Sequence, residues 1–209
     1  NTCVSLNLYG IDVAGAMTQF IKVHENKVYR IDPSLSLKDA ALVEPLAVGV
    51  HMVRQANVEK GDVVLVVGAG PIGLIAATVA SIKGCQVMMS EVHPYRVKKA
   101  KEFGATQTIN SGTTNAEEAV REIVGEEGVD VAIEAVGIPA TWNICQNIVK
   151  PGGHLANVGV HGKKVDFEIQ KLWIKNLTIT TGLVNTNTTP MLIKATSANQ
   201  KDLKKMITH

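Results

Sequence analysis

The sequence has little cysteine, few aromatic residues and little net charge. Its three cysteines are too sparse and too odd in number for a disulfide framework, and they fit a reducing, cytoplasmic compartment. A formal net charge of +2 without any basic block argues against nucleic acid as a partner. No apolar run approaches the roughly 20 residues of a membrane helix, and no secretory signal opens the chain, so we expect no membrane partner. A small-molecule partner is the remaining expectation.

From Gly61 onward, short apolar, β-branched runs alternate with amphipathic segments. The runs predict strands and the segments between them predict helices. Alternation of this kind is typical of an α/β protein with a parallel sheet covered on both faces, and six strands match a doubly wound (Rossmann) dinucleotide-binding domain. The predicted strands are 63–67, 86–90, 106–109, 129–134, 154–158 and 177–181, and the predicted helices run to about 83 and over 94–103, 116–124, 140–149 and 189–198.

The first 60 residues have a different pattern. Alternating runs at 19–23 and 27–31 predict short strands. Ser36 predicts the start of a capped helix, and Pro45 suits the first turn of a longer helix that ends near Ala56. The sequence begins with Asn rather than Met, and residues 206–209 resemble the start of a strand. We therefore expect that it is cut from a longer protein at both ends.

The sharpest motif is the glycine-rich segment that follows the predicted strand 63–67. Gly68 permits a tight turn, Gly70 lets the backbone approach a pyrophosphate, and Gly73 lets the following helix pack close to the strand. Pro71 and Ile72 begin that helix, whose N-terminus presents N–H groups and a partial positive charge to phosphates. A tight βα turn without a ligand, or the glycine-rich turn of a methyltransferase, are the competing interpretations. The spacing of the third glycine favours a dinucleotide.

An acidic residue follows at the expected distance. Glu91 ends the second predicted strand, 18 residues beyond Gly73, close to the ~20-residue spacing of the carboxylate that binds ribose hydroxyls. A carboxylate there favours NAD, because it would repel the 2′-phosphate of NADP. Arg96 weakens this preference slightly, since a nearby arginine can accept that phosphate. NADP is thus the less favoured cofactor.

An ordered series of motifs extends over essentially the whole chain. It consists of Glu44-Pro45-Leu46-Ala47-Val48-Gly49-Val50-His51, Gly61-Asp62, the Gly68–Gly73 loop, Tyr95-Arg96, residues 100–105, Asp130-Val131-Ala132-Ile133-Glu134-Ala135-Val136-Gly137, Gly152-Gly153, Val158-Gly159-Val160 and residues 206–209. The series resembles the zinc-containing medium-chain alcohol and polyol dehydrogenases, in the style of sorbitol, threonine and secondary-alcohol dehydrogenases.

The resemblance implies a set of cofactor contacts beyond the glycine loop. Val48 and Ile72 would flank the nicotinamide ring, and Val136 would lie on the adenine side. Each apolar residue taken alone would more simply be a core residue. The remaining implied contacts are Val158, Gly159 and Val160 beside the nicotinamide, and Gly182, Leu183 and Val184 near its carboxamide.

The resemblance also implies a domain plan. Residues 1–43 would be the C-terminal part of a β-rich, GroES-like catalytic domain. Residues 44–185 would form the NAD-binding Rossmann domain, and residues 186–209 would return toward the catalytic domain. The family often dimerises through edge strands of this domain, so we expect a homodimer or homotetramer, with residues 176–181 as the candidate edge.

The zinc ligands of the family are mostly outside this sequence. The resemblance implies that the early Cys and His-Glu ligands precede Asn1, while Glu44 matches a late position at or near the metal. One carboxylate cannot hold zinc, and Glu44 fits equally well as an acidic residue at a helix start. Cys3 matches a ligand of the structural zinc lobe but is here more simply a free thiol. No catalytic residue can be assigned.

The resemblance implies that the intact enzyme oxidises a primary or secondary alcohol or polyol to an aldehyde or ketone by hydride transfer to NAD, with zinc as the Lewis acid. The 209 residues alone would bind NAD(H) and turn over little. Two alternatives stay open: a non-catalytic, stand-alone dinucleotide-binding module, and a zinc-independent quinone-type reductase. Glu44-Pro45 and Cys3 argue against the second.

Overall fold

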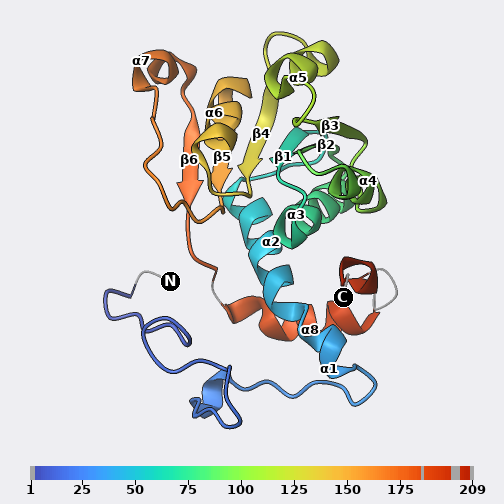
Figure 1. Cartoon of the computed structure of the whole chain (residues 1–209), viewed down its shortest axis with the longest axis vertical. Coiled ribbons are helices and arrows are strands. Elements are labelled where there is room, and N and C mark those ends of the chain that lie inside the picture. The colour runs from blue at the N-terminus through green and yellow to red at the C-terminus, as the bar shows by residue number, and fades with distance from the viewer. Residues whose placement is uncertain (1–2, 185, 199–202, 208–209) are drawn as a thin grey trace. The chain divides into compact units, whose positions relative to one another are not determined.

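The protein divides into two units in the computed structural model, which describes residues 3–184, 186–198 and 203–207 (Figure 1). The larger unit is Pro45–Leu183. The other unit combines Asn1–Glu44 with Val184–His209. Among the described residues, no helix is both long and apolar enough to cross a membrane.

The larger unit is built on a six-stranded parallel sheet with the order β3-β2-β1-β4-β5-β6. This order confirms the predicted doubly wound Rossmann fold, in which the chain runs outward from the middle of the sheet in both directions. Parallel strands place all their carboxyl ends along one edge. The strands are β1 (Val63–Val67), β2 (Gln86–Glu91), β3 (Gln107–Asn110), β4 (Val129–Glu134), β5 (Val149–Asn157) and β6 (Thr178–Thr181).

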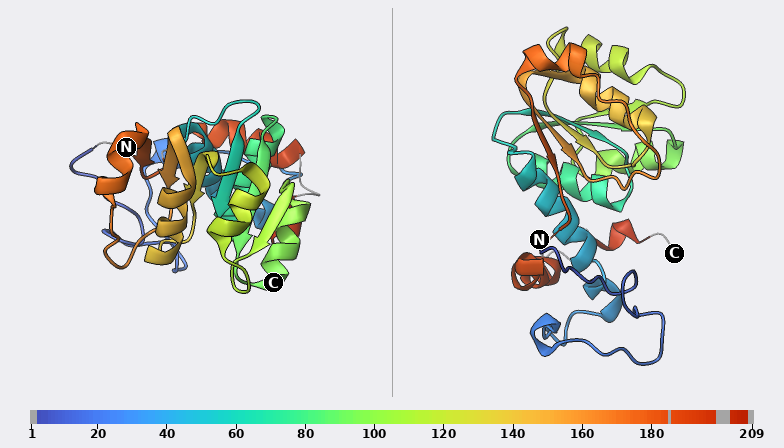
Figure 2. Two further views of the ribbon diagram at one scale, coloured as in Figure 1. Left: turned by 90° about the horizontal axis from the view of Figure 1, so that it is seen from above. Right: turned by 90° about the vertical axis from the view of Figure 1, so that its left-hand side faces the viewer.

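Helices lie on both faces of this sheet (Figure 2). Successive side chains of a strand point to opposite faces, so the two faces of β1 bury different partners. Leu65 and Val67 join a buried cluster with α5 (Ala116–Val124) and α6 (Pro139–Ile148). α3 (Pro71–Ile82) packs on β1 and β2, and α4 (Pro94–Glu102) on β2 and β3. The shorter elements are α7 (Ile169–Leu172), which the sequence did not predict, and the 3-10 helix η2 (Trp173–Lys175).

The junction between α6 and β5 differs from the prediction. Helix α6 ends at Ile148, and β5 already begins at Val149, before the Pro151-Gly152-Gly153 segment. The pairing of β4 with β5 jumps from Val129↔Val149 to Val131↔His154, so the extra residues form a bulge within the strand. Proline and glycine here interrupt strand pairing; the helix has already ended.

The smaller unit contains short elements joined by extended chain. Ser36 caps α1 (Leu37–Ala40) by accepting a hydrogen bond from the Asp39 N–H, as its sequence predicted. Helix α1 contacts α8 (Thr189–Ala198), and Lys204 Nζ lies 3.2 Å from the buried Asp39 carboxylate. The unit also holds the 3-10 helices η1 (Glu25–Lys27), η3 (Thr186–Thr188) and η4 (Lys204–Met206) and the first residues of α2 (Val43–Gln55), a helix that ends close to the predicted position.

The strands predicted at 19–23 and 27–31 are wrong. Among residues 3–35, the structure contains only an isolated bridge between Tyr9 and Val13 and the helix η1. Phe20 is 88% exposed and Val28 is 62% exposed, so the alternating pattern buries no face. A strand needs a hydrogen-bonding neighbour, and these runs have none in the described chain. The strand start predicted at 206–209 is also not formed at Met206, which closes η4; Thr208 and His209 lie outside the described residues.

One carboxylate links three strands at the opposite, amino-terminal edge of the sheet. Asp130 of β4 accepts a hydrogen bond of 2.8 Å from the Val63 N–H of β1 and pairs with Lys150 of β5. Burial alone would raise the pKa of the Asp130 carboxyl, but the bonds from Lys150 and Val63 outweigh it and hold the pKa below its ordinary value. The charged form therefore stabilises the fold.

Asp130→Asn is expected to lower the free energy of unfolding by about 1 kcal/mol at neutral pH, because it removes a charge-assisted contact. A lowered pKa means that this stabilisation is complete above the pKa of the unfolded chain, about 3.9, and is lost as the pH falls through the folded value. Urea unfolding at pH 7 and pH 3 measures both effects. Glu126→Gln is the control: its pair with Arg121 is exposed, so it should change stability by less than about 0.5 kcal/mol. Equal effects of both variants at pH 7 would contradict the assignment.

Candidate functional site

The candidate site lies where the strand order reverses. Strands β1 and β4 are neighbours, and their following connections lead to opposite faces of the sheet, which leaves a crevice outside their carboxyl ends. The loop after β1 contains Gly68–Gly73, and the loop after β4 contains residues 135–138. Ligands of doubly wound proteins bind at this switch point.

Two glycines of the first loop are required by the protein's own packing. Gly68 has φ +106°, which side chains rarely adopt, and its N–H donates to the Ser90 carbonyl of β2 at 2.8 Å. A Cβ on Gly73 would collide with the Gly68 carbonyl oxygen. These contacts fold the loop tightly against β1, as predicted.

Gly70 has no such internal reason to be glycine. Its φ of −72° suits any residue, and a Cβ placed on it would meet no atom of the described chain within 4 Å. It is also the N-cap of α3, where it supplies no side-chain hydrogen bond to the first turn. The space above Gly70 is open, beside a helix N-terminus that attracts anions.

Glu91 is buried beneath this loop. The side chain is only 7% exposed, one carboxylate oxygen accepts the Ala69 N–H at 2.9 Å, and the other accepts the N–H groups of Val92 and His93. Each carboxylate oxygen has two lone pairs, so Glu91 retains capacity for a further donor. The acid predicted from spacing thus lies directly against the glycine loop.

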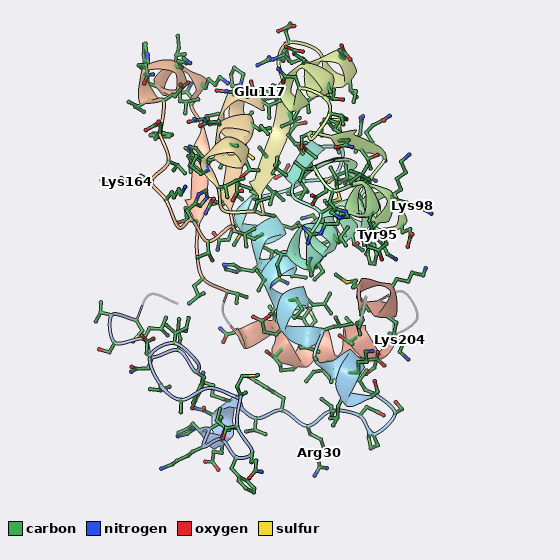
Figure 3. The ribbon with its side chains drawn as sticks, viewed as in Figure 1. Arg30, Tyr95, Lys98, Glu117, Lys164 and Lys204 are labelled. Carbon is green, nitrogen blue, oxygen red and sulfur yellow. The ribbon has the colours of Figure 1, made fainter. Side chains whose placement is uncertain are left out.

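Arg96 lies close to Glu91 without a tight bond. Its guanidinium is 3.9 Å from the Glu91 carboxylate, and its side chain is 56% exposed. Arg96 belongs to α4, from which Tyr95 and Lys98 also extend into solvent (Figure 3). The structure therefore brings Gly68, Glu91 and Arg96 into one continuous region.

Apolar side chains at the carboxyl edge are exposed instead of packed in the core. Val136 is 45% exposed, Val160 is 92% exposed and Leu183 is 48% exposed, while Ile72, Val158 and Val48 are half-buried. Val136 lies over Gly68, since a Cβ on that glycine would be 2.6 Å from a Val136 methyl. The simple core interpretation of these residues therefore fails for Val136, Val160 and Leu183.

The loops after β4 and β5 are in backbone contact through two glycines. Gly137 has φ +91°, and a Cβ on it would strike the backbone of Val160. A Cβ on Gly159 would strike the Gly137 backbone and the Glu134 carboxylate. Gly137 and Glu134 were assigned no role from the sequence, although a charged residue that ends strand 129–134 directly after the apolar residues 131–133 was a signal that could have marked Glu134.

Helix α2 contributes to the same edge of the larger unit. Gly49 lies so close to α3 that a Cβ would collide with Ile75. Helices α2 and α3 are therefore in contact at Gly49, the residue next to Val48. A Cβ on Gly182 would be 3.6 Å from His51 Nε2, and burial lowers the pKa of His51. Gly182 therefore lies beside α2.

The described residues do not fit a zinc ion. No group of three or more His, Cys, Asp or Glu side chains lies close enough together within the described ranges to hold a metal. Glu44 is exposed, and Cys3 is an exposed free thiol. Glu44 and Val184 belong to the smaller unit, so their assignments to zinc and cofactor remain predictions. Cys85 and Cys145 are buried free thiols of the core.

A doubly wound sheet with a glycine loop and an acidic strand end is the arrangement of dinucleotide-binding oxidoreductases. Comparisons with known proteins identify the family within this class. Residues 71–198 match the model of the zinc-binding dehydrogenase family. Sorbitol dehydrogenase from Bacillus subtilis is 38% identical over 149 residues, which cover 71% of this chain and 42% of that protein. Human sorbitol dehydrogenase is 30% identical over 198 residues, which cover 93% of this chain and 56% of that protein.

Solved structures agree. Zinc-dependent alcohol dehydrogenase 2 from Streptococcus pneumonia, in its apo form, is 43% identical with a TM-score of 0.75, covering 82% of this chain and 50% of that chain. A structure from Sinorhizobium meliloti 1021 bound to NADP is 26% identical with a TM-score of 0.87, covering 95% of this chain and 59% of that chain. The chain belongs to the zinc-binding dehydrogenase family, as its motifs predicted, and it spans about half the length of these relatives.

The two loop glycines are expected to respond differently to the same substitution. Gly73→Ala forces a methyl group onto the Gly68 carbonyl and should lower the free energy of unfolding by about 2–3 kcal/mol. Gly70→Ala meets open space and should change it by less than about 1 kcal/mol. Thermal unfolding of both variants measures the difference, and a large loss for Gly70→Ala would show that the open space is not present in solution.

Proposed function

We propose that this chain is the NAD(H)-binding part of a zinc-dependent alcohol or polyol dehydrogenase. The observation that carries the proposal is Gly70, a glycine that neither backbone strain nor internal packing demands. The absence of a side chain is explained if a ligand approaches the backbone at this position, because a side chain would occupy the space of the ligand. A pyrophosphate on the N-terminus of α3 is that group, because N–H groups and the helix dipole both favour an anion.

The apolar edge residues support the rest of the cofactor site. Exposed Val136, beside Gly68, suits the adenosine side, and the loop of Val158, Gly159 and Val160 suits one face of the nicotinamide. A flat apolar ring gains by covering such exposed side chains, while backbone groups fix its orientation. Val48 and Ile72 on the other face, and the carboxamide contacts Gly182, Leu183 and Val184, belong to the same proposal.

NAD is the proposed cofactor in preference to NADP. Glu91 lies below the glycine loop with acceptor capacity left for ribose hydroxyls, and its charge would repel a 2′-phosphate. Arg96 moderates that repulsion from 3.9 Å. The NADP-bound relative shows that the fold itself does not decide between the two cofactors.

For the whole enzyme, we propose oxidation of an alcohol or polyol to an aldehyde or ketone, in line with the sorbitol and alcohol dehydrogenases that the chain resembles. The described residues hold and orient the cofactor. Zinc, with Glu44 at or near it, would need further ligands, so these 209 residues by themselves are proposed to be inactive. Residues 1–43 and 186–209 are proposed as parts of a GroES-like catalytic domain, in a cytoplasmic protein whose thiols stay reduced.

A stand-alone, non-catalytic dinucleotide-binding module is the second candidate. It is favoured by the finding that the described residues contain no group fit for a metal. Continuation of the coding sequence upstream of Asn1 into Cys and His-Glu ligands would remove this candidate.

Calorimetric titration with NADH and NADPH is expected to show tighter binding of NADH. Glu91→Gln removes the charge but keeps an acceptor, so NADH binding should weaken about tenfold and the preference against NADPH should shrink. Gly70→Ala should abolish binding of both, because its methyl occupies the phosphate position.

Thermal unfolding of the same variants is the control, because the amide nitrogen of Glu91→Gln would face one of the N–H groups that the carboxylate now accepts, and the measurement shows whether each variant remains folded. A folded wild-type chain that binds neither nucleotide would contradict the proposed function. Undiminished NADH binding by Gly70→Ala would remove the observation on which it rests.

An oligomer is proposed to form through the edge strand β6, whose outer backbone groups have no neighbouring strand in the described sheet. Thr180→Pro, in the middle of β6, removes an N–H donor and should shift a dimer or tetramer toward monomer. Sedimentation equilibrium at micromolar concentration measures this. The equivalent change on the opposite edge, Thr108→Pro in β3, serves as control, and a monomeric wild type would refute the proposal.

A further inference from the structure

A completely buried carboxylate lies between the loops that follow β4 and β5. Glu134, at the end of β4, is 0% exposed. One of its oxygens, Oε1, accepts the Val136 N–H at 3.0 Å, the Gly137 N–H at 2.9 Å and the Thr141 hydroxyl at 2.6 Å. This oxygen therefore fixes the loop after β4 to the first turn of α6.

The other oxygen, Oε2, faces His161 in the loop after β5. His161 Nε2 lies 3.3 Å from Oε2, which accepts no hydrogen bond from any of the described residues. The same Nε2 lies 2.8 Å from Asn157 Oδ1. Because the Asn157 amide nitrogen donates to the Gly159 carbonyl at 3.0 Å, its oxygen must be the acceptor toward His161. His161 Nε2 consequently carries a hydrogen, which it donates to Asn157, and its approach to Glu134 Oε2 at 3.3 Å is a close contact between a donor nitrogen and the carboxylate, not an aligned hydrogen bond.

The contact between Glu134 and His161 is expected to affect the loops after β4 and β5, because it is buried between them. A buried carboxylate oxygen without a paired donor costs on the order of 1–3 kcal/mol. Loss of the His161 N–H would drive Glu134 Oε2 toward water. The loops cannot adjust separately, since Gly137 and Val160 are in backbone contact and Gly159 touches both Gly137 and Glu134. Any shift of Glu134 thus moves the loop of Val158–Val160.

We propose that Glu134 and His161 are positioning residues that hold the Val158–Val160 loop in place for the nicotinamide half of the cofactor. This inference rests on the proposed function, which assigns that loop to the nicotinamide. The phosphate and adenosine half depends on Gly70, Glu91 and Val136. Glu134 holds the Val136 N–H through Oε1, whereas the oxygen that faces His161 is Oε2. The two halves of the cofactor should therefore differ in their dependence on this pair.

The experiment compares binding of NADH with binding of ADP-ribose, which lacks the nicotinamide. His161→Phe keeps a ring against Trp142, 6.3 Å away between ring centres, but removes the N–H donor. Glu134→Gln breaks the same contact from the other side, since its amide would place a donor opposite a donor. Both variants are expected to weaken NADH binding about tenfold and ADP-ribose binding less than twofold. The double variant should lose no more than either single one.

Two further variants separate the effect of the His161 N–H from the effect of packing by the histidine ring. His161→Gln retains an N–H donor without the ring, so it should keep NADH binding within about threefold of wild type. His154→Ala removes a histidine of β5 that lies opposite Val131 and not opposite Glu134, and it should change the binding of neither ligand. If Glu134→Gln fails to fold, the His161 variants alone decide the question.

Three outcomes would overturn the inference. Equal loss of NADH and ADP-ribose would show a structural role only, and unchanged NADH binding in His161→Phe would show no role. A folded wild-type chain that binds neither ligand would refute the proposed function first, and this inference with it. Wild-type binding of both ligands with the selective loss described above supports the two together.

Discussion

The contact between the Gly68 carbonyl and Gly73 is the constraint on which the carboxyl edge of the sheet depends. No side chain fits between them, so the chain must leave β1 in a turn with positive φ and enter α3 at once. That turn places the Gly68 N–H on β2, brings Ala69 to Glu91, and leaves room for Val136 above the loop. The loops after β4 and β5 pack in the same way, because at Gly137 and Gly159 the backbone of one loop again contacts the backbone of the other.

The buried carboxylates at this edge explain which backbone donors are left for a ligand. Glu91 takes up the N–H groups of Ala69, Val92 and His93, and Glu134 takes up those of Val136 and Gly137. The first turn of α3 receives no side-chain cap, because its N-cap is Gly70. The first turn of α6 likewise receives no side-chain cap, but only the N-terminus of α3 adjoins the open space at Gly70, which suits a pyrophosphate.

The larger unit could be predicted from sequence because its signals are local. Strands 63–67 and 129–134 are buried on both faces, and runs rich in apolar residues mark them to the residue, although the second also contains Asp130 and Glu134. The runs at 19–23 and 27–31 carry an equally good alternating pattern but form no strand, since pairing depends on a neighbour that the described residues do not supply. The predicted strand 154–158 missed the first residues of β5 for a related reason: the bulge in β5 depends on the register with β4, which no local pattern encodes.

Only those residues of the site that belong to a motif of known spacing could be predicted from the sequence. Glu91 was found because its distance from the glycines is fixed by the length of one helix and one strand. Glu134 ends its strand in the same way, yet its hydrogen-bond partner Thr141 and the neighbouring His161 follow on separate elements, and only folding brings them together. Glu134 matters physically because it is buried: a carboxylate that water cannot reach must take its hydrogen-bond donors from the loops around it. The loops that supply those donors are therefore held in fixed positions around the carboxylate.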